Sequence, residues 1–269
     1  MTYFGFLARF LLAPILLLGL VAWLDYRRGR PLPAPFGGFP LWAAVAINVL
    51  LALAYTTLWD NYLVASGVWS YDPDLVTGVT IGWVPIEEYT FFVLQPILAG
   101  LWLAFLLRRW RFEGAPPSLR WRWIPLAFLG LVWLASVALL AASWAPGTYL
   151  GLILVWALPP IMLQVAFGGD ILARHWRFVA TVILTVTLYL GLADFLAIGS
   201  GTWTINPAQS LPWLIGGVLP VEEVLFFLLT DTLVVFGVIL LLSQDGRSRG
   251  RDLGQNLRQR LAPRRREVP

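Results

Sequence analysis

The sequence predicts an all-α fold, a polytopic membrane bundle of seven transmembrane helices. Of its 269 residues, 59% are hydrophobic and only 13% are charged, too few to give a soluble domain a polar surface. Seven apolar stretches come close to the length of about 20 residues that a helix needs to cross a bilayer. An acidic motif also occurs twice, each time just before or inside such a stretch, which indicates an internal repeat.

The apolar stretches define the expected helices in order. They cover residues 2–24, 40–61, 84–107, 123–143, 148–168, 177–196 and 214–242. The first stretch has no small-residue cleavage site and continues to Asp25, so we expect a retained helix and no signal peptide. There are no cysteines, which excludes disulfides, thiol nucleophiles and cysteine-ligated metals.

Arginines between the stretches predict the orientation. They follow the first, third, fifth and seventh stretches, and the alternate loops carry none. The positive-inside rule then places the N-terminus outside and the C-terminus in the cytoplasm. We expect the protein to be an integral protein of the cell (inner) membrane. The net charge of +4 is explained by this topology signal, so we expect no nucleic-acid partner.

The acidic motif consists of a proline, one further residue, two glutamates and, after two more positions, two phenylalanines. The first copy holds Pro85, Glu87, Glu88, Phe91 and Phe92, and the second holds Pro220, Glu222, Glu223, Phe226 and Phe227. Proline is favoured at a helix start, which places the glutamates in the first turn. Capping and compensation of the helix dipole would explain one such pair, but the duplication favours a functional role.

The repeat extends beyond the motif. Tyr55, Asp60, Gly67, Trp69 and Pro73 recur in the same order, 134 positions later, as Tyr189, Asp194, Gly201, Trp203 and Pro207, and after one inserted residue the motifs match at 135. We therefore expect a three-helix module over residues 1–110, a connector with the fourth helix over 111–146, a second module over 147–243, and a disordered basic cytoplasmic tail over 244–269. A single connecting helix makes the modules parallel, so both motifs face one side of the membrane.

These residues predict acid–base chemistry in a dry site. Adjacent helical residues project about 100° apart, so one glutamate of each pair points inward and its neighbour supports it. A carboxyl in a low-dielectric site can hold a proton at neutral pH and deliver it. The phenylalanines lie one turn further along, with Trp69 and Trp203 nearby, and aromatic faces stabilise cations. Together they favour proton-initiated carbocation chemistry on a hydrophobic olefin.

Further polar residues are candidates for supporting roles. Asp60 and Asp194 can hydrogen-bond either to the glutamates or to the tryptophan loops. Asp231 lies about 12 Å deeper than Glu223 by helical rise, and an acid at that depth is a functional candidate. Tyr55 and Tyr189 complete the set because they repeat with the aspartates.

The doubled Pro-x-Glu-Glu motif, the upstream Asp and Gly-x-Trp, and the two modules resemble the integral-membrane lycopene cyclases of bacteria, archaea and fungi, in their fused form. The resemblance runs from the first helix to Leu242. It implies cyclisation of the linear ends of lycopene to β-rings, giving γ-carotene and β-carotene, by an isomerase of the intramolecular-lyase type. It also implies essential roles for Glu87, Glu88, Glu222 and Glu223, no cofactor or metal, and carotenoids and lipid as partners.

Several alternatives stay open. A proton-coupled transporter could use the glutamates and Asp231 as a relay, and a relative of the lycopene cyclases could act on a C50 carotenoid. A diphosphate-binding prenyltransferase is disfavoured because acids and arginines lie on opposite sides. The chain has no lysine for a retinal Schiff base, and one histidine is too few for a di-iron site. The sequence also leaves open whether one or both ends of lycopene are cyclised, and whether the protein associates with itself or with other carotenoid enzymes.

Overall fold

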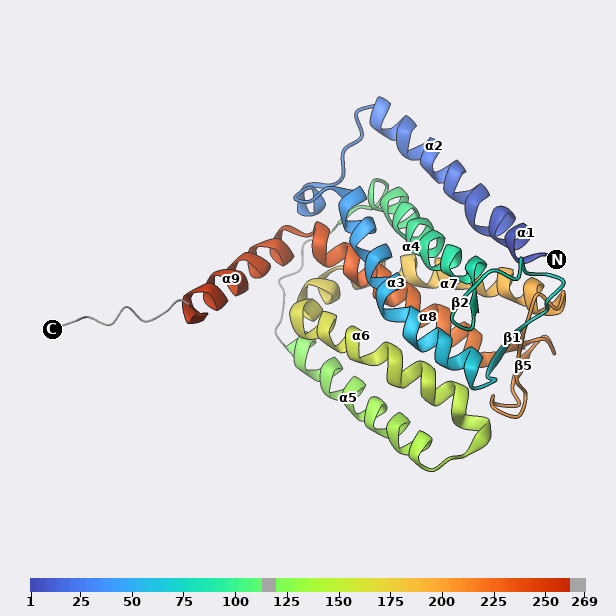
Figure 1. Ribbon diagram of the computed structural model, residues 1–269. Coiled ribbons are helices and arrows are strands. Elements are labelled where there is room, and N and C mark those ends of the chain that lie inside the picture. Colours follow the sequence, from blue (N-terminus) through green and yellow to red (C-terminus); the bar gives the residue numbers. More distant parts are fainter. Residues whose placement is uncertain (113–119, 262–269) are drawn as a thin grey trace.

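A computed structural model describes residues 1–112 and 120–261, and in this part seven helices are long and apolar enough to cross a membrane (Figure 1). The first span combines α1 (Tyr3–Leu7), the π-helix η1 (Ala8–Leu12) and α2 (Ala13–Arg27). The others are α3 (Leu41–Ala65), α4 (Ile86–Leu107), α5 (Arg120–Ala141), α6 (Thr148–Arg174), α7 (Trp176–Gly199) and α8 (Val221–Leu242). Short 3-10 turns cover Ala34–Phe36 (η2) and Ala145–Gly147 (η3). The predicted all-α membrane bundle is confirmed.

The centre of the bundle is formed by α4 and α8, the two helices that begin at the acidic motifs. They contact each other, and each also packs against an outer pair: α2 and α3 contact α4, whereas α6 and α7 contact α8. Contacts between α3 and α8 and between α4 and α7 close the ring, and α5 packs on the outside of α6. Both motifs start at the end of the bundle where the strands and the N-terminus lie (Figure 1).

Short strands replace the beginning of the last predicted helix. Strands β5 (Leu214–Ile215) and β6 (Leu219–Pro220) form a hairpin before α8, so the expected start at residue 214 is wrong by seven positions. Pro220 is the N-cap residue in extended conformation, and the helix begins only after it. The first half has the same arrangement in β2 (Thr80–Ile81) and β3 (Val84–Pro85).

The two halves also pair directly through strands. Strand β1 (Trp69–Tyr71) pairs antiparallel with β4 (Trp203–Ile205), and Tyr71 lies opposite Trp203. This two-stranded sheet lies over the same end of the bundle as the starts of α4 and α8 (Figure 1). It therefore joins the two Gly-x-Trp segments of the repeat.

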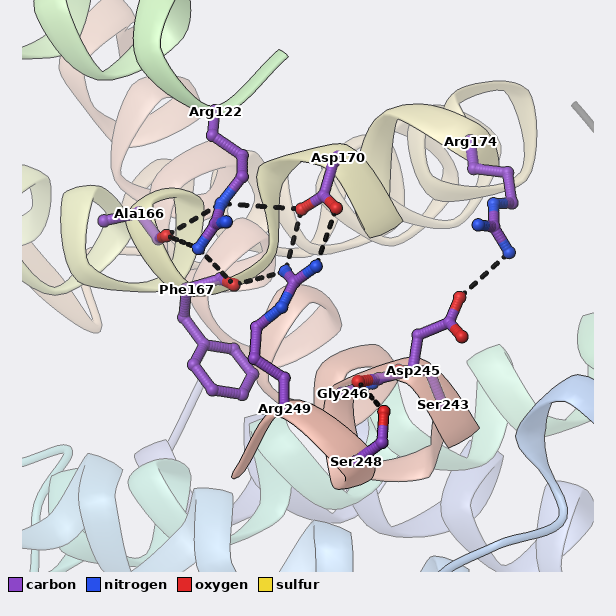
Figure 2. Close-up of polar contacts among 10 residues, drawn as sticks. All are labelled: Arg122, Ala166, Phe167, Asp170, Arg174, Ser243, Asp245, Gly246, Ser248 and Arg249. Carbon is purple, nitrogen blue, oxygen red and sulfur yellow. Dashed lines mark hydrogen bonds and ion pairs between the residues drawn. The ribbon is translucent and has the colours of Figure 1, made fainter. Parts of the chain in front are cut away.

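The C-terminal segment continues as a helix, α9 (Gln244–Leu261), where the sequence analysis expected a disordered tail. Figure 2 shows the ion pairs that hold its start to α6: Arg249 bonds both carboxylate oxygens of Asp170 at 2.8 Å, and Arg174 lies 2.9 Å from Asp245. Arg249 also donates to the carbonyl of Phe167, beside the non-helical Gly168 that kinks α6. Residues 262–269 of the predicted tail lie outside the described part.

The glycines of the two hairpin turns offer a matched stability test. Gly82 and Gly217 both have positive φ, +68° and +74°, but a Cβ at Gly82 would lie 2.1 Å from Oδ1 of Asn61 whereas one at Gly217 would meet nothing within 4 Å. Gly217→Ala should therefore cost only the backbone strain, about 1 kcal/mol, and Gly82→Ala clearly more. Thermal unfolding of both purified variants checks this, and equal melting temperatures would contradict it.

Candidate active site

A small cavity of about 30 Å³ lies between the starts of α4 and α8. This volume has room for about one or two water molecules. It is lined by one glutamate from each motif, an aspartate, two tyrosines, two tryptophans and three phenylalanines: Glu88, Glu223, Asp194, Tyr3, Tyr71, Trp69, Trp203, Phe91, Phe226 and Phe227. The two halves of the chain therefore contribute to one shared cavity.

The carboxyl of Glu88 is held by two tyrosines. Tyr3 donates its hydroxyl to Oε2 of Glu88 at 2.5 Å, and Tyr71 donates to the same oxygen at 3.1 Å. Burial and the nearby Glu88 carboxylate raise the pKa of Tyr71 well above its usual value, so this hydroxyl stays protonated and remains a donor. Both tyrosines were missed by the sequence analysis.

The carboxyl of Glu223 has an equivalent partner. Tyr149 at the start of α6 donates to its Oε1 at 2.6 Å. Tyr3 and Tyr149 occupy the first turns of the first and fifth spans, 146 positions apart. A repeat comparison carried into these two spans would have found the pair.

The other glutamate of each pair turns toward the adjacent loop. Glu87 accepts the backbone N–H of Thr77 at 2.7 Å, and Glu222 accepts that of Leu211 at 2.6 Å. This divergence follows from the 100° step between neighbouring helical residues. The structure thus places Glu88 and Glu223 on the cavity, and Glu87 and Glu222 where they fix the loops that lead into α4 and α8.

The repeated aspartates differ in their contacts. Asp194 lines the cavity and accepts the indole N–H of Trp203 at 2.9 Å. At the equivalent position Asp60 is fully buried, and neither its carboxylate oxygens nor the indole nitrogen of Trp69 has a hydrogen-bond partner among the described residues. The cavity is therefore asymmetric on its aspartate side.

The aromatic side chains form a continuous wall. Phe226 stacks on Trp59, with ring centroids 5.8 Å apart and planes within 8°, and Trp59 stacks on Trp156 at 4.2 Å. Phe91 meets Phe227 edge to face at 6.2 Å across the α4–α8 contact. Trp59 and Trp156 were not among the sequence candidates. This wall surrounds the carboxyls with apolar surface and aromatic faces.

Besides Glu87, Glu222 and Asp60, four further sequence candidates do not line the cavity. Phe92 lines a different pocket between α3, α4, α6 and α8. Tyr55 and Tyr189 donate to the backbone carbonyls of Trp156 and Phe10, at 2.9 and 2.8 Å, and so join spans of different modules. Asp231 is buried deeper, where Gln95 and Thr187 donate to its two carboxylate oxygens at 2.6 and 2.9 Å.

The site's geometry suits proton transfer to an apolar molecule. Two carboxyls from different halves share one small cavity, each is oriented by a tyrosine, and the remaining lining is largely aromatic. In the described part no group of three or more histidines and acids has the arrangement of a metal site.

The chain is similar to known lycopene cyclases. The chain is 37% identical over 241 residues to the lycopene beta-cyclase of Halobacterium salinarum, covering 89% of this chain and 95% of that protein. It is also 37% identical over 200 residues to the bifunctional lycopene cyclase/phytoene synthase of Podospora anserina, and 34% over 212 residues to that of Phaffia rhodozyma. These alignments cover 71% and 72% of this chain but only 33% and 31% of the fungal proteins.

No solved structure matches the chain. The lycopene cyclase family matches residues 2–106 and 146–241, which include both acidic motifs and leave out the stretch that contains α5. On this match, and on its similarity to the archaeal relative along nearly the full length of both, the chain belongs to the lycopene cyclase family.

Proposed function

We propose that this protein is a lycopene β-cyclase, an enzyme that closes the linear end groups of lycopene to β-rings without net oxidation or reduction. Family membership and the name of the archaeal relative support this activity. The structural observation that carries the proposal is the shared cavity, which Glu88 and Glu223 both line together with aromatic side chains. The products are γ-carotene after one ring and β-carotene after two, and the reaction class is that of an intramolecular lyase or isomerase.

The proposed reaction is an acid–base cycle. A protonated carboxyl adds H⁺ to the terminal double bond of the end group and leaves a tertiary cation. The neighbouring double bond attacks this cation, a carbon–carbon bond forms, and the six-membered ring closes with the cation now in the ring. A carboxylate removes one ring proton and a double bond forms. One proton enters and one leaves, so atoms and electrons balance without a redox partner.

We assign the proposed roles of the lining residues from their contacts. Glu88 and Glu223 exchange the protons, and the hydroxyls of Tyr3, Tyr71 and Tyr149 orient their carboxyl groups. The aromatic faces of Phe91, Phe226 and Phe227 stabilise the cation and exclude water that would capture it. Glu87 and Glu222 act as positioning residues, because their hydrogen bonds hold the loops before α4 and α8.

The composite site requires the modules to run parallel, and we propose that they do. Two observations support this arrangement. Each of α4 and α8 packs against two outer helices, and Tyr3 and Tyr149 make equivalent hydrogen bonds to Glu88 and Glu223. We further propose that the end of the bundle with the acidic motifs faces the non-cytoplasmic side of the cell membrane. The arginines near α9 then lie in the cytoplasm.

Pigment analysis in a lycopene-accumulating bacterium tests the function directly. Expression of this chain should turn red cells yellow-orange and give γ-carotene or β-carotene on chromatography. Unchanged lycopene in membranes that contain the folded protein would contradict the proposal.

The composite site predicts that each half is needed for the first ring. Glu88→Gln alone and Glu223→Gln alone keep the shape of the side chain but remove its proton exchange, so each should lower γ-carotene formation by about 100-fold or more. The measurement is initial rate in liposomes at matched protein amounts and melting temperatures. Tyr189→Phe is the control, because its hydroxyl bonds a carbonyl outside the cavity, and it should keep its activity.

A near-normal rate of γ-carotene formation in either glutamine variant would overturn the composite site. Each module would then have to supply its own acid and base.

A further inference from the structure

Two of the apolar pockets on the flanks of the bundle are lined by helices from both halves of the chain. The first, here the α3–α6 groove, has a volume of about 290 Å³ and is walled by α3, α4, α6 and α8. The second, the α2–α7 groove, has about 310 Å³ and is walled by α2, α4 and α7. Each is roughly ten times the volume of the central cavity.

The two grooves correspond to each other through the repeat. Pro14 and Leu17 line the α2–α7 groove, and Pro160 and Leu163, 146 positions later, line the α3–α6 groove. Tyr189 and Tyr55, 134 positions apart, line the two grooves in the same way. The two grooves are thus repeat-equivalent. A difference between them can therefore indicate which one serves the central cavity.

They differ in their relation to the active site. Phe91 and Phe226 line both the α3–α6 groove and the central cavity, so the two adjoin at these side chains. The described lining of the α2–α7 groove shares no residue with the cavity. In the first span, Phe6 packs between Phe10 and Trp203. Its ring centroid lies 5.3 Å from that of Phe10 and 5.0 Å from that of Trp203.

We propose that the α3–α6 groove binds the polyene chain of the linear carotenoid, whose end group passes Phe91 and Phe226 into the central cavity. This rests on the proposed cyclase function and adds the path of the substrate. A cavity of about 30 Å³ has room only for water, so the end group enters by displacing these two rings. The groove itself lies at the lower end of the volumes usual for small-molecule sites.

The groove's surface fits a hydrocarbon. The side-chain amides of Asn48, Gln95 and Gln164 reach it, but each donates to a partner within the protein: the carbonyl of Ala44, Asp231 and the carbonyl of Leu233. The rest of the wall is mainly aliphatic and aromatic.

The mouth of the groove is on the outside of the bundle. Leu163 on α6 is 73% exposed and Leu51 on α3 is 60% exposed. A bilayer places acyl chains against such apolar surface, and a carotenoid dissolved among them can enter sideways without crossing water. The groove therefore connects the medium that holds the substrate with the wall of the site.

Paired tryptophan substitutions test the path. The double variant Leu51→Trp/Leu163→Trp narrows the mouth of the α3–α6 groove from two helices, and Leu17→Trp/Thr185→Trp makes the same change at the repeat-equivalent positions of the α2–α7 groove. Both are made in the full chain, reconstituted in liposomes of one composition. Formation of γ-carotene from lycopene is followed by chromatography, with kcat and KM measured separately.

We expect the first variant to lose about tenfold or more in kcat/KM, mainly through a higher KM, because the change removes binding of the chain and leaves the acids in place. The control variant should stay within about twofold of the unaltered protein. If the first variant does not fold, as judged by its melting temperature, Leu163→Trp alone is used against Leu17→Trp.

Equal losses of kcat/KM in both variants, or a normal KM in the first, would overturn the proposed binding of the polyene chain in the α3–α6 groove. The cyclase function would be unaffected by this result. Failure of the unaltered protein to convert lycopene would instead remove the proposed function, and the groove's occupant with it.

Discussion

The burial of two carboxyl groups in an apolar site is the constraint around which this protein is organised. Glu88 and Glu223 are only 6% and 3% exposed, so bulk water cannot solvate them and the protein must supply hydrogen-bond partners. It does so with tyrosine hydroxyls from the first and fifth spans. Because these tyrosines come from α1 and α6, the outer helices must pack on α4 and α8 for the acids to be satisfied. Formation of the site therefore requires the packing of these outer helices on α4 and α8.

The neighbouring glutamates extend this dependence to the loops. Glu87 and Glu222 bond the backbones of Thr77 and Leu211, which lie before the hairpins that lead into the central helices. In each motif the first glutamate therefore holds the loop before the central helix, and the second glutamate lines the cavity. The pairing of β1 with β4 joins the two approaches.

Much of this could be predicted from the sequence, because hydrophobic length and exact spacing are visible in it. The seven spans follow from apolar length, the repeat from the constant offset between its copies, and the divergence of Glu87 from Glu88 from the helical period. A repeat comparison would show that Tyr3 and Tyr149 recur, but not that they bond the acids, because they lie far from the motifs in the chain. The start of α8 was missed because Leu214–Leu219 is apolar enough to read as helix but pairs as strands before Pro220. The contacts of Tyr55 and Asp231 could not be predicted either, because they depend on which face each helix turns toward its neighbours, and composition does not show this.

The central claim is that ring closure is started by a proton from a carboxyl in this cavity and ended by loss of a proton. The most direct measurement is turnover of lycopene by the purified protein in D₂O, over many cycles, followed by mass spectrometry of the product. The account predicts one solvent deuterium at the protonated carbon of each new ring. Rings formed without deuterium over many turnovers, or a strict requirement for a reductant, would contradict it.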